Sequence, residues 1–408
     1  MQVVKGEDQR IHVSGRITSE NAGDLSQKLM EYAFGHDSEE EKEADDTESF
    51  AEKEVLVLDL SGVTYISSAG LRVLMSLYKS GKKLRLVGVT PDVYEIFEVT
   101  GMTRLFEIRR ALRKVSVEGL PLIGTGASAS VYRLDGERII KVFVPEMPEE
   151  FVYRENEITR EAFLSGIDTM VAYDIVSTEK GLAAIYEDLH ARDLINCMKE
   201  DHSRIPELVR GFGCFVRGAH ALKLDAQKFP DAREDMASML ARYEMLDISK
   251  ETADILVDLL KKMIPGSDEF SHGDCHVGNV MMKDDGRYMF IDVGRMSRGH
   301  IVYDLISMFV QYRYQSFRGI RNLPVSPCAQ PFSEEERLQI WKTYFRYATG
   351  IEEEALTRKA EEQISVIAGI RMLSGRVLRR NFLPDECYDR FVKEALAYAA
   401  DGGEPLLF

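Results

Sequence analysis

The sequence lacks the features that place a protein in or across a membrane. No stretch of the 408 residues approaches the roughly 18 consecutive apolar residues that a bilayer-spanning helix needs. The first ten residues, MQVVKGEDQR, do not show the basic and then apolar pattern of a secretory signal. We therefore expect a cytoplasmic protein with no membrane partner.

Cysteine and positive charge are also in short supply. The five cysteines are odd in number and form no C-x-x-C pair; they are Cys197, Cys214, Cys275, Cys328 and Cys387. This pattern argues against a disulfide framework or a structural zinc site and favours reduced thiols. The 52 lysines and arginines are outnumbered by 68 acidic residues, which gives a net charge of −16. Because such a charge repels phosphate backbones, we expect no nucleic-acid partner, and the oligomeric state stays open.

Half of the net charge comes from one acidic segment, residues 36–54. The segment holds ten acidic and two basic side chains, a net charge of −8, and almost nothing that could be buried. We interpret it as a solvated loop inserted between a helix and the next strand, and an interaction tail is the alternative.

Around this segment, residues 1–113 alternate apolar strands with amphipathic helices. The expected strands are 2–5, 11–14, 55–60 and 84–87, and the expected helices are 20–34, 68–78 and 92–99. The last helix follows Thr90-Pro91-Asp92, which places proline in the first turn. The alternation predicts a small α/β domain over residues 1–113.

Residues 114–408 follow a different pattern and predict a second domain with two lobes. A β-rich lobe of about 114–190 has expected strands at 122–134, 139–143 and 181–186 and an expected helix at 155–165. The lobe of about 191–408 is mostly helical, with one strand-rich interruption at 279–293. Ser333 with Glu336 forms a capping-box pattern in this lobe.

The β-rich lobe contains a glycine-rich segment, GTGASAS, between two strands. Gly124, Gly126 and Ser128 belong to it. Glycine lets the backbone approach a phosphate closely, and free N–H groups can point at its oxygens. The segment is not a Walker A loop, because no Gly-Lys-Ser/Thr follows, and an ordinary hairpin turn is the alternative interpretation.

A lysine and a glutamate in the same lobe are candidates for an ion pair. Lys141 stands among apolar strand residues (IIKVF) and must either reach solvent or meet anions. Glu157 on the next helix is able to pair with it, and Glu161, one turn later on the same face, is the alternative partner. Each of the three could also be an ordinary surface residue.

The most specific pattern is SHGDCHVGN at residues 271–279, followed by FIDVG at 290–294. Asp274 and Asn279 have the spacing of the kinase catalytic loop, D-x-x-x-x-N, in which the aspartate accepts the hydroxyl proton and the asparagine binds Mg²⁺. Asp292, at a strand end and followed by Gly294, matches the metal-binding D-x-G. A carboxylate plus an amide oxygen suits Mg²⁺. With the glycine segment and Lys141 upstream, this order predicts a kinase-type active site.

Other interpretations of the same loop are weaker. His272 and His276 lack a third zinc ligand at a familiar spacing, so we expect them to hold the loop by hydrogen bonds. Cys275 could act as a nucleophile, but a small buried side chain is the more common role.

The string HGDCHVGN with IDVG downstream resembles the aminoglycoside phosphotransferase and choline kinase superfamily, over residues of about 115–408. This family is the small-molecule branch of the protein-kinase-like fold. The resemblance implies that Asp274 is the catalytic base and that Asn279 and Asp292 hold Mg²⁺. It also implies that Lys141 contacts the ATP phosphates, with Glu157 as its ion-pair partner.

The same resemblance implies further roles around the nucleotide. The Gly124–Ser130 loop would cover the phosphates, and the segment Tyr186–Leu189, with Glu187 and Leu189, would be the hinge beside adenine. Asp304, in RMSRGHIVYDL, would brace the catalytic loop.

Residues 1–113 resemble a STAS domain, the fold of anti-sigma-factor antagonists. The matching stretches are DLSGV from Asp59, YISSAGLRVL from Tyr65 and LVGV from Leu86. Such domains bind partner proteins, and many are switched by phosphorylation of a serine just before the glycine. Here that position is Ala69, with Ser68 one residue earlier, so a helix cap is the alternative role for the serine pair.

Together these patterns predict a Mg·ATP-dependent phosphotransferase that transfers the γ-phosphoryl group to a hydroxyl of a small molecule, with a STAS module for regulation or protein binding. The acidic stretches Asp225–Asp235 and Glu244–Asp247 would suit a cationic acceptor, or are simply exposed helix faces. The alternative is a bacterial signalling scaffold or protein kinase. In that alternative the STAS domain captures a regulatory partner of the anti-anti-sigma type, while the kinase lobe senses nucleotide. A third possibility is that the STAS domain only mediates dimerisation.

Overall fold

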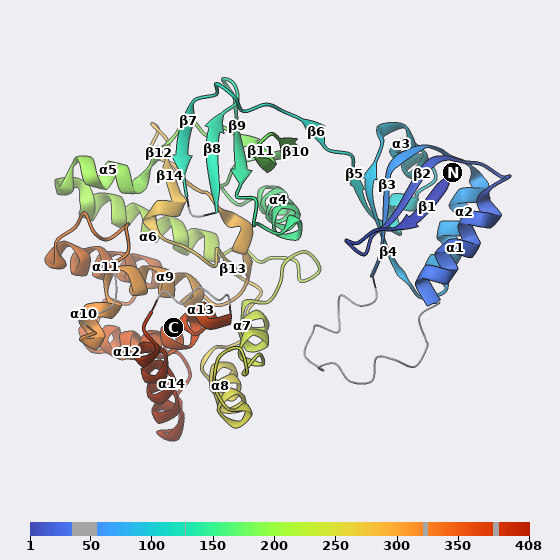
Figure 1. Ribbon diagram of the computed structural model, residues 1–408. Coiled ribbons are helices and arrows are strands. Elements are labelled where there is room, and N and C mark those ends of the chain that lie inside the picture. Colours follow the sequence, from blue (N-terminus) through green and yellow to red (C-terminus); the bar gives the residue numbers. More distant parts are fainter. Residues whose placement is uncertain (35–54, 127, 321–324, 378–382) are drawn as a thin grey trace. The chain divides into compact units, whose positions relative to one another are not determined.

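The structure is a computed structural model that describes residues 1–34, 55–126, 128–320, 325–377 and 383–408 (Figure 1). The acidic segment 36–54 lies outside the described residues, so its interpretation as a loop stays a prediction. The chain divides into two compact units, Met1–Lys114 and Val115–Phe408, which we call unit 1 and unit 2 and describe separately.

Unit 1 is built on a five-stranded sheet in the order β1-β2-β3-β4-β5. Its strands are β1 (Gln2–Lys5), β2 (Ile11–Ile17), β3 (Val55–Ile66), β4 (Lys83–Val89) and β5 (Glu107–Arg110). β1 pairs antiparallel with β2, and the other neighbours pair in parallel. Parallel strands need crossover connections, which here contain the helices α1 (Ala22–Phe34), α2 (Ser68–Lys79) and α3 (Pro91–Val99).

One apolar core holds unit 1 together. Leu58 and Leu60 of β3 alternate with less buried neighbours, as expected for a strand with one face on a core. β3 continues to Ile66, beyond the expected strand 55–60, because Val63 and Ile66 are also buried in this core. Pro91 stands in the first turn of α3, as the sequence predicts.

Unit 2 begins with a β-rich lobe around a mainly antiparallel sheet. In this sheet β10 (Ala172–Thr178), β11 (Gly181–Glu187), β9 (Arg138–Phe143), β8 (Ala129–Arg133) and β7 (Leu122–Thr125) follow one another in that order. β6 (Arg113–Lys114) marks the junction of the two units. The lobe has one long helix, α4 (Glu149–Leu164), which starts earlier than the expected residue 155.

The second lobe of unit 2 is mostly helical. Its helices are α5 (Leu194–Glu200), α6 (Ile205–His220), α7 (Ala232–Leu240), α8 (Lys250–Met263), α9 (Val302–Tyr312), α10 (Tyr314–Arg318), α11 (Glu334–Thr349), α12 (Glu354–Met372), α13 (Ser374–Val377) and α14 (Asp385–Ala400). Two small sheets interrupt them: β12 (Arg192–Asp193) with β14 (Val280–Met282) and β15 (Tyr288–Phe290), and β13 (Phe270–Ser271) with β16 (Ser297–Arg298). The catalytic motifs lie in the segments that connect the strands of these two sheets.

The helices of this lobe are fixed by both caps and a buried polar cluster. The predicted capping box is confirmed, because Glu336 N donates to Ser333 Oγ and Ser333 N donates to the Glu336 carboxylate. Deeper in the lobe, Glu361 of α12 accepts hydrogen bonds from Trp341 Nε1 at 2.6 Å and from Arg313 Nε at 3.0 Å. This cluster ties α12 to α11 and to the end of α9.

Candidate active site

Lys141 of β9 is the centre of a charged cluster in unit 2. Its Nζ lies 2.7 Å from Glu155 Oε1 and 2.8 Å from Asp292 Oδ1, and only 15% of the side chain is exposed. Tyr186 adds a hydrogen bond, since its hydroxyl donates to Glu155 Oε1 at 3.2 Å. The lysine therefore does not reach bulk solvent but links the β-rich lobe to the segment after β15.

The prediction that Glu157 pairs with Lys141 is wrong, because the partner is Glu155. Glu155 is buried on the face of α4 that packs on the sheet, together with Val152 and Ile158, whereas Glu157 is exposed. The alternative partner, Glu161, instead contacts Lys228, with 2.7 Å between Oε2 and Nζ. Two residues along a helix correspond to roughly 200° of rotation, so Glu155 and Glu157 lie on opposite faces.

The charges of this cluster shift one another's ionisation. Burial raises the pKa of Glu155, although Lys141 opposes this effect. Burial also acts to raise the pKa of Asp292, but the nearby positive charges, Lys141 first, outweigh burial, so the pKa of Asp292 is lowered overall. The pKa of Lys141 is raised, because its two carboxylates outweigh the cost of burying its charge. The cluster thus holds one cation between two carboxylates, and Asp292 is held in its ionised form.

Asp304 of α9 holds the loop Ser271–Asn279, which we call the catalytic loop. Asp304 is fully buried and accepts hydrogen bonds from His272 N at 3.0 Å and Gly273 N at 2.8 Å. His220 Nε2 lies 2.9 Å from Asp304 Oδ2, the oxygen that also accepts from His272 N. Burial would raise the pKa of Asp304, but its bond with His220 is the first of several that lower it overall. The implied role of Asp304 in bracing this loop is confirmed.

The loop brings Asp274, Asn279 and Asp292 together. Asn279 Nδ2 donates to Asp274 O at 2.9 Å, which fixes the ends of the D-x-x-x-x-N motif against each other. Ile291 N donates to Asn279 O at 3.0 Å, so Asp292 follows directly after a residue bonded to Asn279. These backbone links explain why residues 274, 279 and 292 occupy one site.

Asp292 and Gly294 depend on unusual local geometry. Asp292 has φ +58°, in the left-handed region that few residues other than glycine adopt, so its backbone is strained. A Cβ on Gly294 would lie 2.7 Å from Glu155 Cγ. The glycine of D-x-G therefore lets α4 approach closely enough for Glu155 to reach Lys141.

The two histidines and the cysteine of the loop have structural partners. His272 Nε2 lies 3.0 Å from Ile291 O, and His272 Nδ1 lies 3.3 Å from Asp274 N. His276 Nδ1 accepts from Gly278 N, and burial lowers the pKa of His276. Cys275 is fully buried, and burial raises the pKa of its thiol. The expectation that these side chains support the loop is confirmed.

The predicted nucleotide-contacting residues lie on the strands beside Lys141. Lys141 pairs with Val131 of β8, the strand after the glycine segment, and with Ala184 of β11, the strand that leads to the hinge. Gly124 lies within β7. Gly126 N donates to Ala129 O at 2.9 Å, and this hydrogen bond closes the turn. Ser128 O accepts from Val144 N at 3.0 Å, and residue 127 lies outside the described part of the chain.

The predicted hinge follows directly from β11. The Glu187 carboxylate accepts from Val171 N at 3.2 Å, so this side chain is occupied within the protein. Leu189 is buried, with 6% exposure. The structure therefore places the hinge and the glycine segment on either side of Lys141, while their contacts with a nucleotide stay predictions.

Sequence reasoning missed three residues of this site, Glu155, His220 and Arg371, and it assigned Tyr186 only to the hinge. Glu155 and Tyr186 complete the lysine cluster, His220 supports Asp304, and Arg371 of α12 donates to Tyr303 O at 2.9 Å and to Gly273 O. Glu155 could have been found as the glutamate that shares a helix face with Val152 and Ile158. His220 and Arg371 carry no local signal, because their partners are distant along the chain.

A divalent cation is the group that this donor set would suit. Asp292 keeps 48% of its side chain exposed, and its carboxylate is held ionised beside Lys141. The Asn279 side chain uses its NH₂ group for Asp274 O, which turns its oxygen to other partners. Carboxylate and amide oxygens are the ligands that Mg²⁺ prefers. These two residues therefore fit the predicted metal site.

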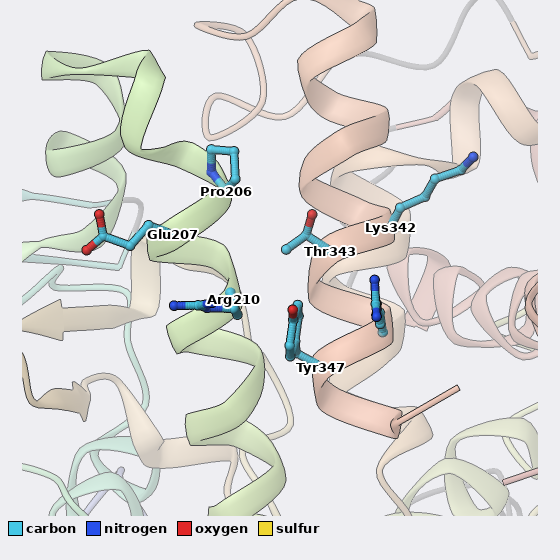
Figure 2. A pocket seen from close by; sticks show the side chains of 7 residues that line it. Pro206, Glu207, Arg210, Lys342, Thr343 and Tyr347 are labelled. Atoms are coloured by element: carbon cyan, nitrogen blue, oxygen red, sulfur yellow. The ribbon is translucent and has the colours of Figure 1, made fainter. Parts of the chain in front are cut away.

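A separate groove lies between α6 and α11 in unit 2 (Figure 2). It has a volume of about 510 Å³ and is lined by Pro206, Glu207, Arg210, Lys342, Thr343, Arg346 and Tyr347. None of the catalytic-loop residues lines it, so we do not assign the acceptor to this groove.

In unit 1, the serine pair stands where β3 meets α2. Ser67 is the N-cap of α2, and its hydroxyl accepts from Gly70 N at 3.3 Å. Ser68 is exposed in the first turn, and Ala69 packs partly against the core. The capping role therefore belongs to Ser67.

The geometry of unit 2 defines a class of protein. A strand lysine paired with a helix glutamate, a D-x-x-x-x-N loop and a D-x-G aspartate are the arrangement of a protein-kinase-like phosphotransferase. Comparison with known families agrees: residues 119–321 match the phosphotransferase enzyme family, and residues 3–115 match the STAS domain. The chain is therefore a STAS domain followed by a kinase-type phosphotransferase domain of the phosphotransferase enzyme family.

Known proteins similar to the chain are of two kinds. Curated relatives include the anti-sigma-B factor antagonists of Listeria monocytogenes and Listeria innocua, each 35% identical over 72 residues, or 17% of this chain. The chain spans 63% of the length of these relatives.

Similar solved structures are aminoglycoside phosphotransferases. The gentamicin–APH(2")-IIa complex has 13% identity and a TM-score of 0.44, covering 76% of this chain and 98% of that one. A thermostable mutant of APH(4)-Ia has 13% identity and a TM-score of 0.46, covering 70% and 95%. Separately, no helix among the described residues is long and apolar enough to cross a membrane.

Proposed function

We propose that unit 2 transfers the γ-phosphoryl group of Mg·ATP to a hydroxyl of a small molecule. The observation that carries this proposal is the position of Lys141 Nζ, 2.7 Å from Glu155 and 2.8 Å from Asp292. In kinases this ion pair and the D-x-G aspartate must both be in place for phosphoryl transfer. The contacts of Lys141 with Glu155 and Asp292 support the proposal for this reason.

In the proposed reaction, the acceptor oxygen forms a bond to the γ-phosphorus while the bond from the γ-phosphorus to the β-phosphate oxygen breaks, and ADP leaves. Asp274 accepts the proton of the acceptor hydroxyl. Lys141 contacts the α/β-phosphates, and the Gly124–Ser130 turn covers them. Asn279 and Asp292 would hold Mg²⁺, which supplies charge neutralisation on the phosphates. Phosphoryl transfer needs mainly positioning and such electrostatic stabilisation.

The acidic stretches give no separate support for a cationic acceptor. Asp225 accepts from Gln227 N, and Asp231 caps α7 through Arg233 N and Glu234 N. Asp247 is 92% exposed and lies 3.8 Å from Arg376. These carboxylates act in local caps and ion pairs, so the proposal names a hydroxylated small molecule without a required positive charge.

The experiment is to follow label from γ-labelled ATP into a panel of sugars, amino alcohols and aminoglycosides, with and without Mg²⁺. Wild-type protein should label at least one class of acceptor only when Mg²⁺ is present. Asp292→Asn should abolish this transfer while the thermal unfolding of the free protein stays cooperative. Transfer at the wild-type rate by the Asp292 variant would contradict the metal assignment.

We further propose that unit 1 binds a regulatory protein partner, as the match to anti-sigma-B factor antagonists suggests. Pull-down of a purified anti-sigma factor of that type should succeed with wild-type protein and with Asp274→Asn alike. Binding that depends on Asp274 would instead assign partner recognition to unit 2.

A further inference from the structure

Arg371 approaches the catalytic loop from outside the region that matches the phosphotransferase family. It stands near the end of α12, whereas the match ends at residue 321. Its Nη1 donates to Tyr303 O at 2.9 Å, and its Nη2 donates to Gly273 O. One guanidinium group thus joins the start of α9 to the residue before the catalytic base.

Gly273, whose carbonyl forms the peptide bond to Asp274, is held at both of its backbone groups. Gly273 N donates to Asp304 at 2.8 Å, and Gly273 O accepts from Arg371. Gly273 has φ +78°, and a Cβ there would lie 2.4 Å from Arg295 O, so this turn requires glycine. The orientation of this peptide sets the direction in which the Asp274 side chain leaves the backbone.

The backbone of Asp274 itself has further partners. Its N–H donates to His272 Nδ1, and its C=O accepts from Asn279 Nδ2. His272 and Asn279 belong to the loop motif and both bond to Ile291, so they position Asp274 relative to the loop and to the segment after β15. Arg371 is the contact that positions this turn relative to α12.

α12 is anchored in the helical lobe, so a contact from this helix can fix the position of the loop. Glu361, on the same helix, is 4% exposed and accepts hydrogen bonds from Trp341 and Arg313. Gln363 adds a bond to Pro405 O at 2.7 Å. A side chain projecting from a helix that is anchored in this way can hold a loop within a fraction of an ångström.

The charge of Arg371 is also placed beside the catalytic base. Burial lowers the pKa of Arg371, while Asp274 and Asp304 oppose that change. The guanidinium therefore interacts with both the base and the aspartate that braces the loop.

We propose that Arg371 is a positioning residue for Asp274, supplied by the C-terminal helices rather than by the family motif. This inference rests on the proposed phosphotransferase function. A misplacement of about 1 Å at a catalytic group can lower a rate by roughly a hundredfold, so the loss of this contact should be visible in turnover.

The test compares Arg371→Met and Arg371→Lys with a matched control, Arg376→Met. Arg376 of α13 is likewise buried, with 7% exposure, and donates to a backbone carbonyl, Leu246 O at 2.8 Å, but its partners lie outside the catalytic loop. Turnover is measured as ADP release from Mg·ATP, and the exchange of backbone amides in residues 271–279 is followed by mass spectrometry.

We expect Arg371→Met to lower kcat roughly 10- to 100-fold with the KM for ATP changed less than about twofold, and to speed amide exchange in the loop. Arg371→Lys should keep part of kcat, and millimolar guanidinium ion should partly restore the Met variant. Arg376→Met should lower thermal stability without either effect. If Arg371→Met fails to fold, Arg371→Lys and its loop exchange decide the question.

Two results separate the possible failures. Wild-type protein that releases no ADP with any acceptor would overturn the proposed function, and the exchange data would still report on the loop. Wild-type turnover together with unchanged kcat and unchanged loop exchange in both Arg371 variants would overturn the positioning role.

Discussion

Unit 1 and unit 2 place their polar side chains in opposite ways. In the part of the chain that the structure describes, every buried polar or charged residue lies in unit 2, and the core of unit 1 is apolar. Burying such groups costs free energy unless they are paired, so they persist where chemistry needs them. The difference teaches that unit 2 carries its function in its interior, at Lys141, Glu155 and Asp304. In unit 1 the polar side chains that the structure describes lie at least partly on the surface.

The largest expected effect comes from removing the base of unit 2. Asp274→Asn keeps the size of the side chain but cannot accept the proton of the acceptor. Turnover of Mg·ATP should fall roughly 10²- to 10⁴-fold, the usual contribution of general base catalysis. Circular dichroism and thermal unfolding should match wild type. Turnover within about tenfold of wild type would show that Asp274 is not the base.

The lysine cluster provides the next largest effect and a matched control on one helix. Glu155→Gln removes the charge that shares Lys141 with Asp292, so Lys141 should be drawn towards Asp292 and turnover should fall by roughly one to two orders of magnitude. Glu157→Gln, on the exposed face of α4, should leave turnover unchanged. Steady-state kinetics of both variants checks this, and an equal loss in both would contradict the assignment of Glu155.

Alanine substitutions at two glycines, one in each unit, compare the units in one experiment. A Cβ on Gly294 would lie 2.7 Å from Glu155 Cγ, whereas a Cβ on Gly70 would lie 2.5 Å from Ile17 Cγ2 in the core of unit 1. Gly294→Ala should therefore lower turnover about tenfold or more by displacing Glu155. Gly70→Ala should instead destabilise unit 1 by about 1–3 kcal/mol through overpacking.

Calorimetry measures the stability of both glycine variants, and steady-state kinetics measures their turnover. A Gly70→Ala protein whose unfolding is unchanged would mean that the core of unit 1 has more room than the close contacts with Ile17 and Ile66 indicate. A Gly294→Ala protein with full turnover would mean that α4 need not approach so closely.

The smallest expected effect lies at the start of α2. Ser67→Ala removes the hydroxyl that accepts from Gly70 N and should lower the stability of unit 1 by about 1 kcal/mol. Ser68→Ala, at an exposed position in the first turn, should change it by less than about 0.5 kcal/mol. Chemical denaturation measures both values. The reverse order would assign the cap to Ser68.

Much of the fold and the order of the site could be predicted because the signals are local. The strand VLVLDL, the helix after Thr90-Pro91 and the capping box at Ser333 depend on neighbours in sequence. The catalytic loop is likewise local, since Asp274 and Asn279 are bonded to each other within one turn of chain.

The sequence failed to predict site residues where their roles depend on contacts between distant segments of the chain. Choosing Glu155 over Glu157 requires knowing which face of α4 is buried. Val152 on that face packs against the sheet, and Ile158 and Ala162 pack into the core of the helical lobe. Arg371 has no motif of its own, because its role exists only when α12 docks beside α9.

The central claim, that unit 2 is a Mg·ATP-dependent phosphotransferase, is tested most directly by calorimetric unfolding with Mg·ATP, with ATP alone and without ligand. At about 100 times its dissociation constant a nucleotide stabilises the folded state by about 2.7 kcal/mol. We predict that the transition of unit 2 shifts upwards with Mg·ATP in wild-type protein and much less in Asp292→Ala, while unit 1 is unaffected. A transition that does not move with Mg·ATP in wild-type protein would contradict the claim.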